Sequence, residues 1–130
     1  MSSHLILVVD DDPAILDLIA QLLIEEGYPV LAAGNGQTAL DLAREQLPKL
    51  ILLDLMMPEM NGWQVVGELK AALQTRLIPV ILLSARRDLA TVAGDLEVAA
   101  FVEKPFDIDE LLACVRRILP PTTGIPLSLA

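Results

Sequence analysis

The chain has 130 residues, enough for one domain with a full hydrophobic core but too few for two domains of ordinary size. Its 54% hydrophobic content and mean hydropathy of +0.56 exclude a disordered chain, and no apolar run reaches the roughly 18 to 20 residues that span a bilayer. The net charge of −9 opposes direct binding of nucleic acid, whose phosphates are also negative.

The N-terminal segment does not resemble a secretory signal peptide. It carries no positive charge before its first apolar run, and that run ends at three acids, residues 10–12. We therefore expect a cytoplasmic protein that does not insert into a membrane.

The first two apolar runs predict strands, and each is followed by residues with helical spacing. Leu5–Val9 is continuously apolar, which is typical of a central parallel strand. Asp12 is placed to cap the helix after it, Pro13 suits the first position of that helix, and Gly27 suits its end. The second run, residues 30–33, follows a proline, and we expect it at an edge of the sheet.

The third and fourth apolar runs predict central strands. Leu50–Leu53 and Ile78–Leu83 are both continuously apolar. A short helix containing Gly94 is expected near residues 88–96, after the fourth run. The helix after the third run is predicted to bury Val65, Val66, Leu69 and Leu73.

The fifth run, Phe101–Val102 with flanking alanines, is short and mixed, which favours the other edge of the sheet. The helix after it has the clearest sequence pattern. Asp107 stands three residues before Glu110, as in a capping box, and Ile108 begins the predicted buried face.

Five strand–helix units in succession predict a single α/β domain with a parallel sheet and helices on both faces. We expect this domain to span residues 4–119. The remaining residues, 120–130 with the sequence PPTTGIPLSLA, are expected to form an irregular tail or the start of a linker.

Polar groups follow four of the five predicted strands: Asp10 and Asp11, Asp54, Ser84, and Lys104. Taken one at a time, each fits a structural role in a turn, a helix cap or the surface. Ligands of parallel α/β sheets, however, bind at the carboxyl ends of the strands. We therefore expect the five groups to form one site.

A site of this kind has the chemistry of a phosphate acceptor. Three carboxylates that lie close together repel one another and favour a bound cation, and their oxygens suit Mg²⁺. A carboxylate beside the ion can act as a nucleophile toward phosphorus. A lysine and a hydroxyl can then hold the phosphoryl oxygens.

The motifs ILVVDDDP, LLDLMMPEMNGW, ILLSA and FVEKPF, in this order, resemble those of the receiver domains of two-component response regulators. The resemblance covers about residues 4–119 and implies a flavodoxin-like (βα)5 fold with strand order 2-1-3-4-5. It also implies a phosphorelay, in which a histidine kinase or histidine phosphotransfer protein passes a phosphoryl group to Asp54 and a downstream protein reads the result. Such a domain catalyses only its own phosphorylation and dephosphorylation, so it is not an enzyme with an external substrate.

The resemblance also implies which residues surround the phosphoryl group. Asp11, Asp54 and the backbone carbonyl of Met56 would bind Mg²⁺, or Mn²⁺ in its place, and Asp10 would hold the ion through water. Met56 and Arg86 occupy the two positions that tend to tune the lifetime of the phosphoryl group in this family, at the entrance of the site.

A further set of residues would respond to phosphorylation. Lys104 would pair with the phosphoryl group, the Ser84 hydroxyl would bond to it, and the Phe101 ring would turn into the space that Ser84 leaves. Phe101 lacks the hydroxyl of the tyrosine often found there, and its alternative is an ordinary core residue. The peptide bond between Lys104 and Pro105 is expected to be cis, and Gly62 is expected to permit the turn into the third helix.

Two features depart from the pattern of this family. The interval between Ser84 and Lys104 is slightly shorter than usual, and EVAAF replaces a frequent Gly-Ala-Asp turn. Both fall on the fourth helix, which is part of the face by which receivers usually signal. The resemblance therefore does not fix the geometry of that face.

Parts of the sequence also fit two other functions. VVDDDP approaches the motif of haloacid-dehalogenase-type phosphatases, with Asp10 as nucleophile and Asp12 as acid, but Ala14 departs from that motif and Asp54 would have no role. The other is a receiver-like interaction module that ignores phosphorylation. Such modules typically lose an acid or the lysine, and this sequence retains all of them.

Overall fold

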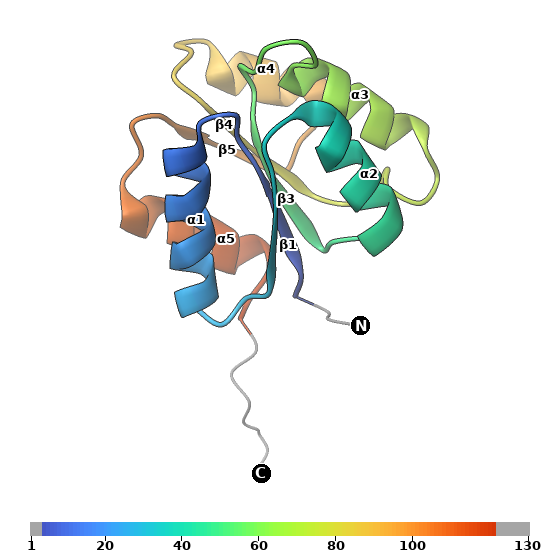
Figure 1. Ribbon diagram of the computed structural model, residues 1–130. Coiled ribbons are helices and arrows are strands. Elements are labelled where there is room, and N and C mark those ends of the chain that lie inside the picture. Colours follow the sequence, from blue (N-terminus) through green and yellow to red (C-terminus); the bar gives the residue numbers. More distant parts are fainter. Residues whose placement is uncertain (1–3, 122–130) are drawn as a thin grey trace.

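The computed structural model describes residues 4–121, and in this part of the chain five strands alternate with five helices (Figure 1). The strands are β1 (Ile6–Val9), β2 (Val30–Ala33), β3 (Leu50–Asp54), β4 (Val80–Ser84) and β5 (Ala100–Glu103). The helices are α1 (Pro13–Glu25), α2 (Gly36–Gln46), α3 (Gly62–Ala71), α4 (Leu89–Leu96) and α5 (Ile108–Ile118). None of the helices within residues 4–121 is long and apolar enough to cross a membrane. Of the expected tail, residues 120–130, positions 122–130 lie outside the described residues.

The strands form one parallel sheet in the order β2-β1-β3-β4-β5, which confirms the predicted fold class and strand order. The three central strands are buried along their whole length, and β2 and β5 form the edges as expected. The register pairs Val9 with Leu53 and Asp54 with Leu83. The carboxyl ends of β1, β3 and β4 therefore lie level with one another.

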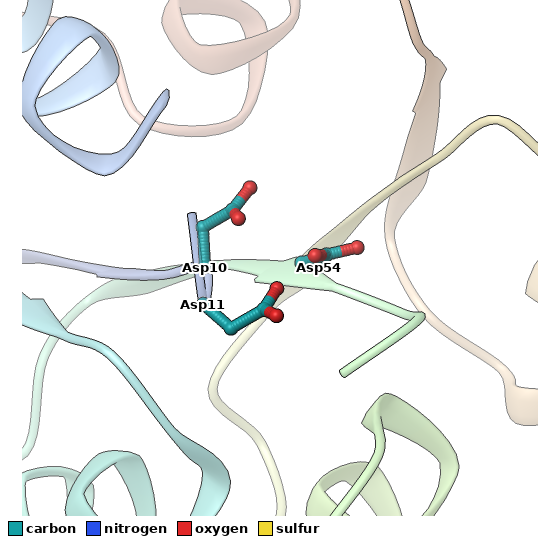
Figure 2. Close-up of side chains that lie close together, drawn as sticks. All are labelled: Asp10, Asp11 and Asp54. Atoms are coloured by element: carbon teal, nitrogen blue, oxygen red, sulfur yellow. The ribbon is translucent and has the colours of Figure 1, made fainter. Parts of the chain in front are cut away.

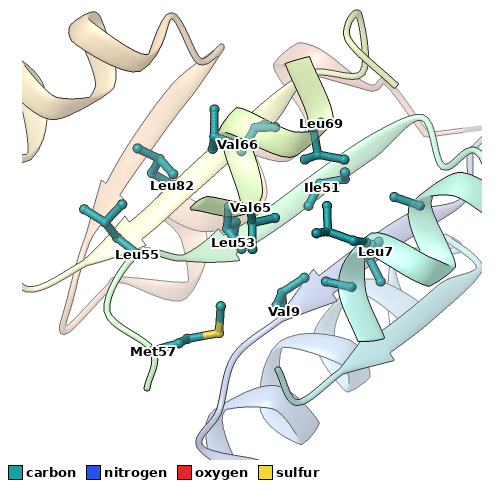
Figure 3. Close-up of a cluster of buried hydrophobic side chains, with 14 of the residues drawn as sticks. Leu7, Val9, Ile51, Leu53, Leu55, Met57, Val65, Val66, Leu69 and Leu82 are labelled. Carbon is teal, nitrogen blue, oxygen red and sulfur yellow. The ribbon is translucent and has the colours of Figure 1, made fainter. Parts of the chain in front are cut away.

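Two apolar layers hold the central strands from opposite faces. Helices α1 and α5 pack on one face of the sheet, and α2, α3 and α4 pack on the other (Figure 1). Successive β3 residues alternate between the layers, with Leu50 and Leu52 in the first and Ile51 and Leu53 in the second. Figure 3 shows the second layer, where side chains of α3 lie over β3 and β4. Close packing on both faces fixes the position at which β3 ends.

Helix α1 begins and ends where the sequence predicts. One Asp12 carboxylate oxygen, Oδ1, accepts hydrogen bonds from the backbone amides of Ala14 (2.9 Å) and Ile15 (3.4 Å), which caps the helix. Pro13 is its first residue, and Gly27 follows its end with a φ of 98°, a conformation that favours glycine.

Three local predictions are wrong. Strand β4 begins at Val80 rather than Ile78, because the Ile78 amide donates to the Thr75 carbonyl (3.1 Å) in the preceding turn. Leu73 lies beyond the end of α3, and its side chain is 78% exposed rather than buried. Ile108 is the first residue of α5 and is 44% exposed, because it stands before the turns that pack on the sheet.

The capping pattern is also different from the prediction. Asp107 accepts bonds from the amides of Asp109 and Glu110 (2.8 and 3.4 Å), which is the side-chain half of a capping box. Both halves are present at the start of α3, where Asn61 Oδ1 accepts from the Gln64 amide (3.0 Å) and Gln64 Oε1 accepts from the Asn61 amide (2.9 Å). These reciprocal bonds fix the first turn of α3, close to the end of β3.

Gly62 permits a close approach of two segments at the point where the chain turns into α3. The only glycine with a positive φ among residues 4–121 is Gly27. A Cβ atom at Gly62 would lie 2.7 Å from the Leu55 Cα and 3.1 Å from the Asp54 carbonyl oxygen. The Gly62 amide also donates to the Leu55 carbonyl (2.9 Å). The absence of a side chain thus lets α3 begin directly against the end of β3.

Candidate functional site

Three carboxylates meet at the carboxyl edge of the sheet. Asp10 and Asp11 follow β1, and Asp54 is the last residue of β3 (Figure 2). One oxygen from each carboxylate lies within 4.8 Å of the other two. Asp10 and Asp54 are 1% and 5% exposed, whereas Asp11 is exposed to solvent. The predicted acidic cluster is therefore formed, with one of its members open to incoming ions.

Lys104 supplies the positive charge of this cluster. Its Nζ atom lies 2.8 Å from Asp10 Oδ2 and 3.6 Å from Asp54 Oδ2. The Lys104 backbone amide donates to the Ser84 carbonyl (2.8 Å), which holds the residue beside the end of β4. The peptide bond to Pro105 is cis, as expected. One lysine faces three acids, so the site as a whole attracts a further cation.

Both oxygens of the buried Asp10 carboxylate have partners. Asp10 Oδ1 accepts a bond from the Asp12 backbone amide (2.9 Å), and Oδ2 accepts the bond from Lys104. Asp54 is engaged less fully, because its Oδ1 accepts from the Met56 amide (3.1 Å) while its Oδ2 has the longer contact with Lys104. Of the two buried carboxylates, Asp54 is therefore held less tightly than Asp10.

Burial raises the pKa of Asp54 from 3.8 to about 6. The charge of Lys104 opposes this rise, the charges of Asp10 and Asp11 add to it, and the bond from the Met56 amide opposes it. The donor set fits a hard divalent cation, because three carboxylates with oxygens close together are the ligands that Mg²⁺ prefers. A cation among them would also relieve their mutual repulsion.

Ser84 and Met56 border the acidic cluster. Ser84 ends β4 and is 1% exposed, and its Oγ accepts a bond from the Arg86 backbone amide (3.2 Å). Met56 is 54% exposed, so its side chain is open to solvent beside Asp54. The described contacts thus place both residues at the carboxyl edge of the sheet, beside the acidic cluster.

The Arg86 guanidinium group is bound to residues outside the acidic cluster. Its Nε and Nη2 atoms donate to the two carboxylate oxygens of Asp88 at 2.8 and 2.7 Å. Its Cζ atom lies 5.2 Å from the centre of the Trp63 ring, which is a cation–π contact. Neither Trp63 nor Asp88 is among the predicted site residues. The contact between Arg86 and Trp63 depends on how α3 packs near the start of α4, which neither segment shows alone.

Phe101 is not a core residue. It lies on the edge strand β5, and its side chain is 40% exposed. The alternative of an ordinary core phenylalanine is therefore wrong. Among the predicted groups, the three acids and Lys104 form one connected cluster, Ser84 borders it, and Phe101 lies apart from it on the surface.

The parallel sheet, the three carboxylates and the lysine at its carboxyl edge define a receiver-type phosphoacceptor domain. Residues 6–116 match the family described as the response regulator receiver domain, and the chain belongs to this family, whose members are the phosphoacceptors of two-component signalling. This membership removes the haloacid-dehalogenase alternative.

Similar proteins agree with this family. The chain is 40% identical to the DNA-binding dual master transcriptional regulator RpaA of a Synechocystis strain, over 93% of this chain and 51% of that protein. It is 45% identical to the transcriptional regulatory protein CpxR of Escherichia coli, over 88% of this chain and 48% of that protein. The chain therefore spans about half the length of these relatives. The crystallised chemotaxis protein CheY4 of Vibrio cholerae is 26% identical with a TM-score of 0.84, covering 91% of this chain and all of that one (100%).

Proposed function

We propose that Asp54 accepts the phosphoryl group and that its phosphorylation switches a protein–protein interaction face. The observation that carries this proposal is the position of the Asp54 carboxylate, which ends a buried strand beside Asp11 and within 3.6 Å of Lys104 Nζ. Asp10 is a poor nucleophile by comparison, because it is 1% exposed and both of its oxygens are bonded.

In this reaction an oxygen of the ionised Asp54 carboxylate attacks the phosphorus of a phosphohistidine. A bond between phosphorus and that oxygen forms as the bond from phosphorus to the donor nitrogen breaks, and the imidazole leaves with the electron pair and takes up a proton. The pKa of about 6 leaves most Asp54 side chains ionised at neutral pH, so the nucleophile is available.

The metal would be held by residues of this chain. Asp11, Asp54 and the Met56 backbone carbonyl would bind Mg²⁺ directly, and Asp10 would hold it through water. Mn²⁺ accepts the same oxygen ligands. When bound, the ion supplies positive charge that offsets the charge on the transferring phosphoryl oxygens.

Lys104 and Ser84 would hold the phosphoryl group once it is transferred. The Lys104 ammonium already lies between Asp10 and Asp54, so a small displacement would bring it to a phosphoryl oxygen on Asp54. The Ser84 hydroxyl would donate a bond to another phosphoryl oxygen. Phe101, exposed two residues before the end of β5, would turn inward toward Ser84 and so change the surface that a partner meets.

Residues 4–119 would form the receiver domain, with residues 120–130 as an irregular tail or linker. The donor would be a histidine kinase or a histidine phosphotransfer protein, and the target an unidentified protein, both met in the cytoplasm. Some relatives are DNA-binding regulators by name. DNA is a poor direct partner for this chain because of its net charge of −9.

Intact-mass spectrometry after incubation with Mg²⁺ and acetyl phosphate tests the proposal. The wild-type protein should gain the mass of one phosphoryl group, and Asp54→Asn should gain none. Asp10→Asn serves as the matched control, because it removes a neighbouring carboxylate but leaves the acceptor, so slower labelling is expected there. An Asp54→Asn protein that is labelled like the wild type would contradict the proposal. Chelation of the metal should slow labelling of the wild type.

A further inference from the structure

Arg86 is a second positively charged residue beside the acceptor site, and the structure shows its charge bound elsewhere. Its backbone amide donates to Ser84 Oγ (3.2 Å), which places it directly after the end of β4. Its guanidinium group is paired through two bonds with Asp88 and stacks on the Trp63 ring. Neither of these contacts belongs to the acidic cluster.

The negative charge of the acidic cluster makes the position of the Arg86 side chain important. Asp10, Asp11 and Asp54 face only Lys104 within the cluster, so the site attracts another cation. A guanidinium group binds carboxylates strongly, because its planar fork matches their two oxygens. If the Arg86 side chain were released, it would compete with a divalent cation for the same oxygens.

Two partners from different elements hold the guanidinium group. The ion pair with Asp88 is partly exposed, with side chains 38% and 51% accessible, and a pair of this kind alone holds a long side chain weakly. The Trp63 ring, on α3, provides a flat surface on which the guanidinium group stacks. Its position in the first turn of α3 is fixed by the reciprocal Asn61 and Gln64 bonds, and it packs against the layer formed by α2, α3 and α4. The two contacts together favour one position of the Arg86 side chain.

We propose that Asp88 and Trp63 are positioning residues that hold Arg86 away from the carboxylates and so keep the site open to a divalent cation. The inference rests on the proposed function, since it takes the acidic cluster to be the metal site. Asp88 and Trp63 act only through Arg86 and touch neither the ion nor the phosphoryl group.

Calorimetric titration of the full chain with Mg²⁺ tests this in four proteins: wild type, Asp88→Ala, Arg86→Ala and the double variant. Asp88→Ala is expected to weaken Mg²⁺ binding about three- to tenfold, because a released Arg86 would occupy the site most of the time. The fraction of protein molecules able to bind the ion would then fall. In the Arg86→Ala background the same substitution should have little effect. The Asp88 side chain makes no capping bond to α4, so its removal should leave that helix folded.

A matched control separates this effect from net charge. Asp95→Ala removes the same charge from an exposed position on α4 and should leave the Mg²⁺ affinity within about twofold of wild type. Equal weakening by Asp88→Ala with and without Arg86 would overturn the proposal, because the Asp88 charge would then act by itself. An unchanged affinity of Asp88→Ala would overturn it as well and leave the proposed function intact. A wild-type protein that binds no Mg²⁺ would overturn both.

Trp63 fluorescence provides a second readout that does not depend on the metal. Trp63 is the only tryptophan of the chain, so its emission reports directly on the contact with Arg86. Without Mg²⁺, the spectrum of Asp88→Ala is expected to move from that of the wild type toward that of Arg86→Ala. A spectrum of Asp88→Ala that is identical to the wild type would show Arg86 still on Trp63 and would overturn the proposal.

Discussion

Replacing Asp54 by asparagine should stabilise the metal-free protein. Asp54 is 5% exposed, and its pKa of about 6 in the folded protein exceeds the ordinary value of 3.8. The carboxylate is therefore less favourable in the folded state than in the unfolded state. A difference of about two pKa units corresponds to about 3 kcal/mol of lost stability at neutral pH. Asp54→Asn removes this charge and keeps an oxygen that can accept the Met56 amide bond.

The direction of the pH dependence follows from the same pKa. Between about pH 4 and pH 6 the folded protein retains a proton on Asp54 that the unfolded chain has released, so the free energy of unfolding falls as the pH rises through this window. The loss is complete above the folded-state pKa. Asp54→Asn should therefore differ little from wild type near pH 4 and be more stable by about 1 to 3 kcal/mol near pH 7.5.

Urea unfolding followed by circular dichroism, in the presence of a chelator, measures this difference. Both proteins are compared near pH 4 and near pH 7.5, and Mg²⁺ is then added at the higher pH, where it should stabilise the wild type more than the variant. A variant that is no more stable than wild type at the higher pH, or an advantage of the same size at both pH values, would refute the reasoning.

Two further substitutions test the packing around the site. Lys104→Met should destabilise the metal-free protein by about 3 to 5 kcal/mol, because it leaves the buried Asp10 carboxylate without its 2.8 Å partner, and urea unfolding with a chelator measures this. An unchanged free energy of unfolding would mean that water replaces Lys104 as the partner of the Asp10 carboxylate, and would contradict this prediction. Gly62→Ala should destabilise the protein by about 1 to 3 kcal/mol, because the new Cβ atom would lie 2.7 Å from the Leu55 Cα and the backbone would have to shift. Thermal unfolding measures the loss, and a melting temperature equal to that of wild type would contradict the close approach.

Much of the site could be predicted because strand ends are visible in the sequence. Asp54 and Ser84 each follow a continuous apolar run, and parallel topology brings the ends of such runs to one edge of the sheet. The same runs predicted the central strands. Asp12 and Pro13 likewise predicted the start of α1, because capping depends on a few neighbouring residues.

The rest depends on contacts between segments that are distant in sequence. The sequence placed Arg86 at the entrance of the site, but only the packing of α3 near the start of α4 places Trp63 under it. Helical spacing predicted that Leu73 and Ile108 would be buried, but spacing alone does not show where a helix ends or which turn first meets the sheet. The sequence predicted Gly62 at the turn into α3 but not its close approach to Leu55, because that contact is a property of the folded chain.

Identification of the phosphorylated residue tests the central claim most directly. The wild-type protein is phosphorylated with acetyl phosphate and Mg²⁺, and borohydride then reduces the acyl phosphate to homoserine, which peptide sequencing by mass spectrometry locates. We predict homoserine at position 54 and an intact aspartate at positions 10 and 11. Homoserine at position 10 or 11, with an unmodified Asp54, would contradict the assignment of Asp54 as the phosphoacceptor.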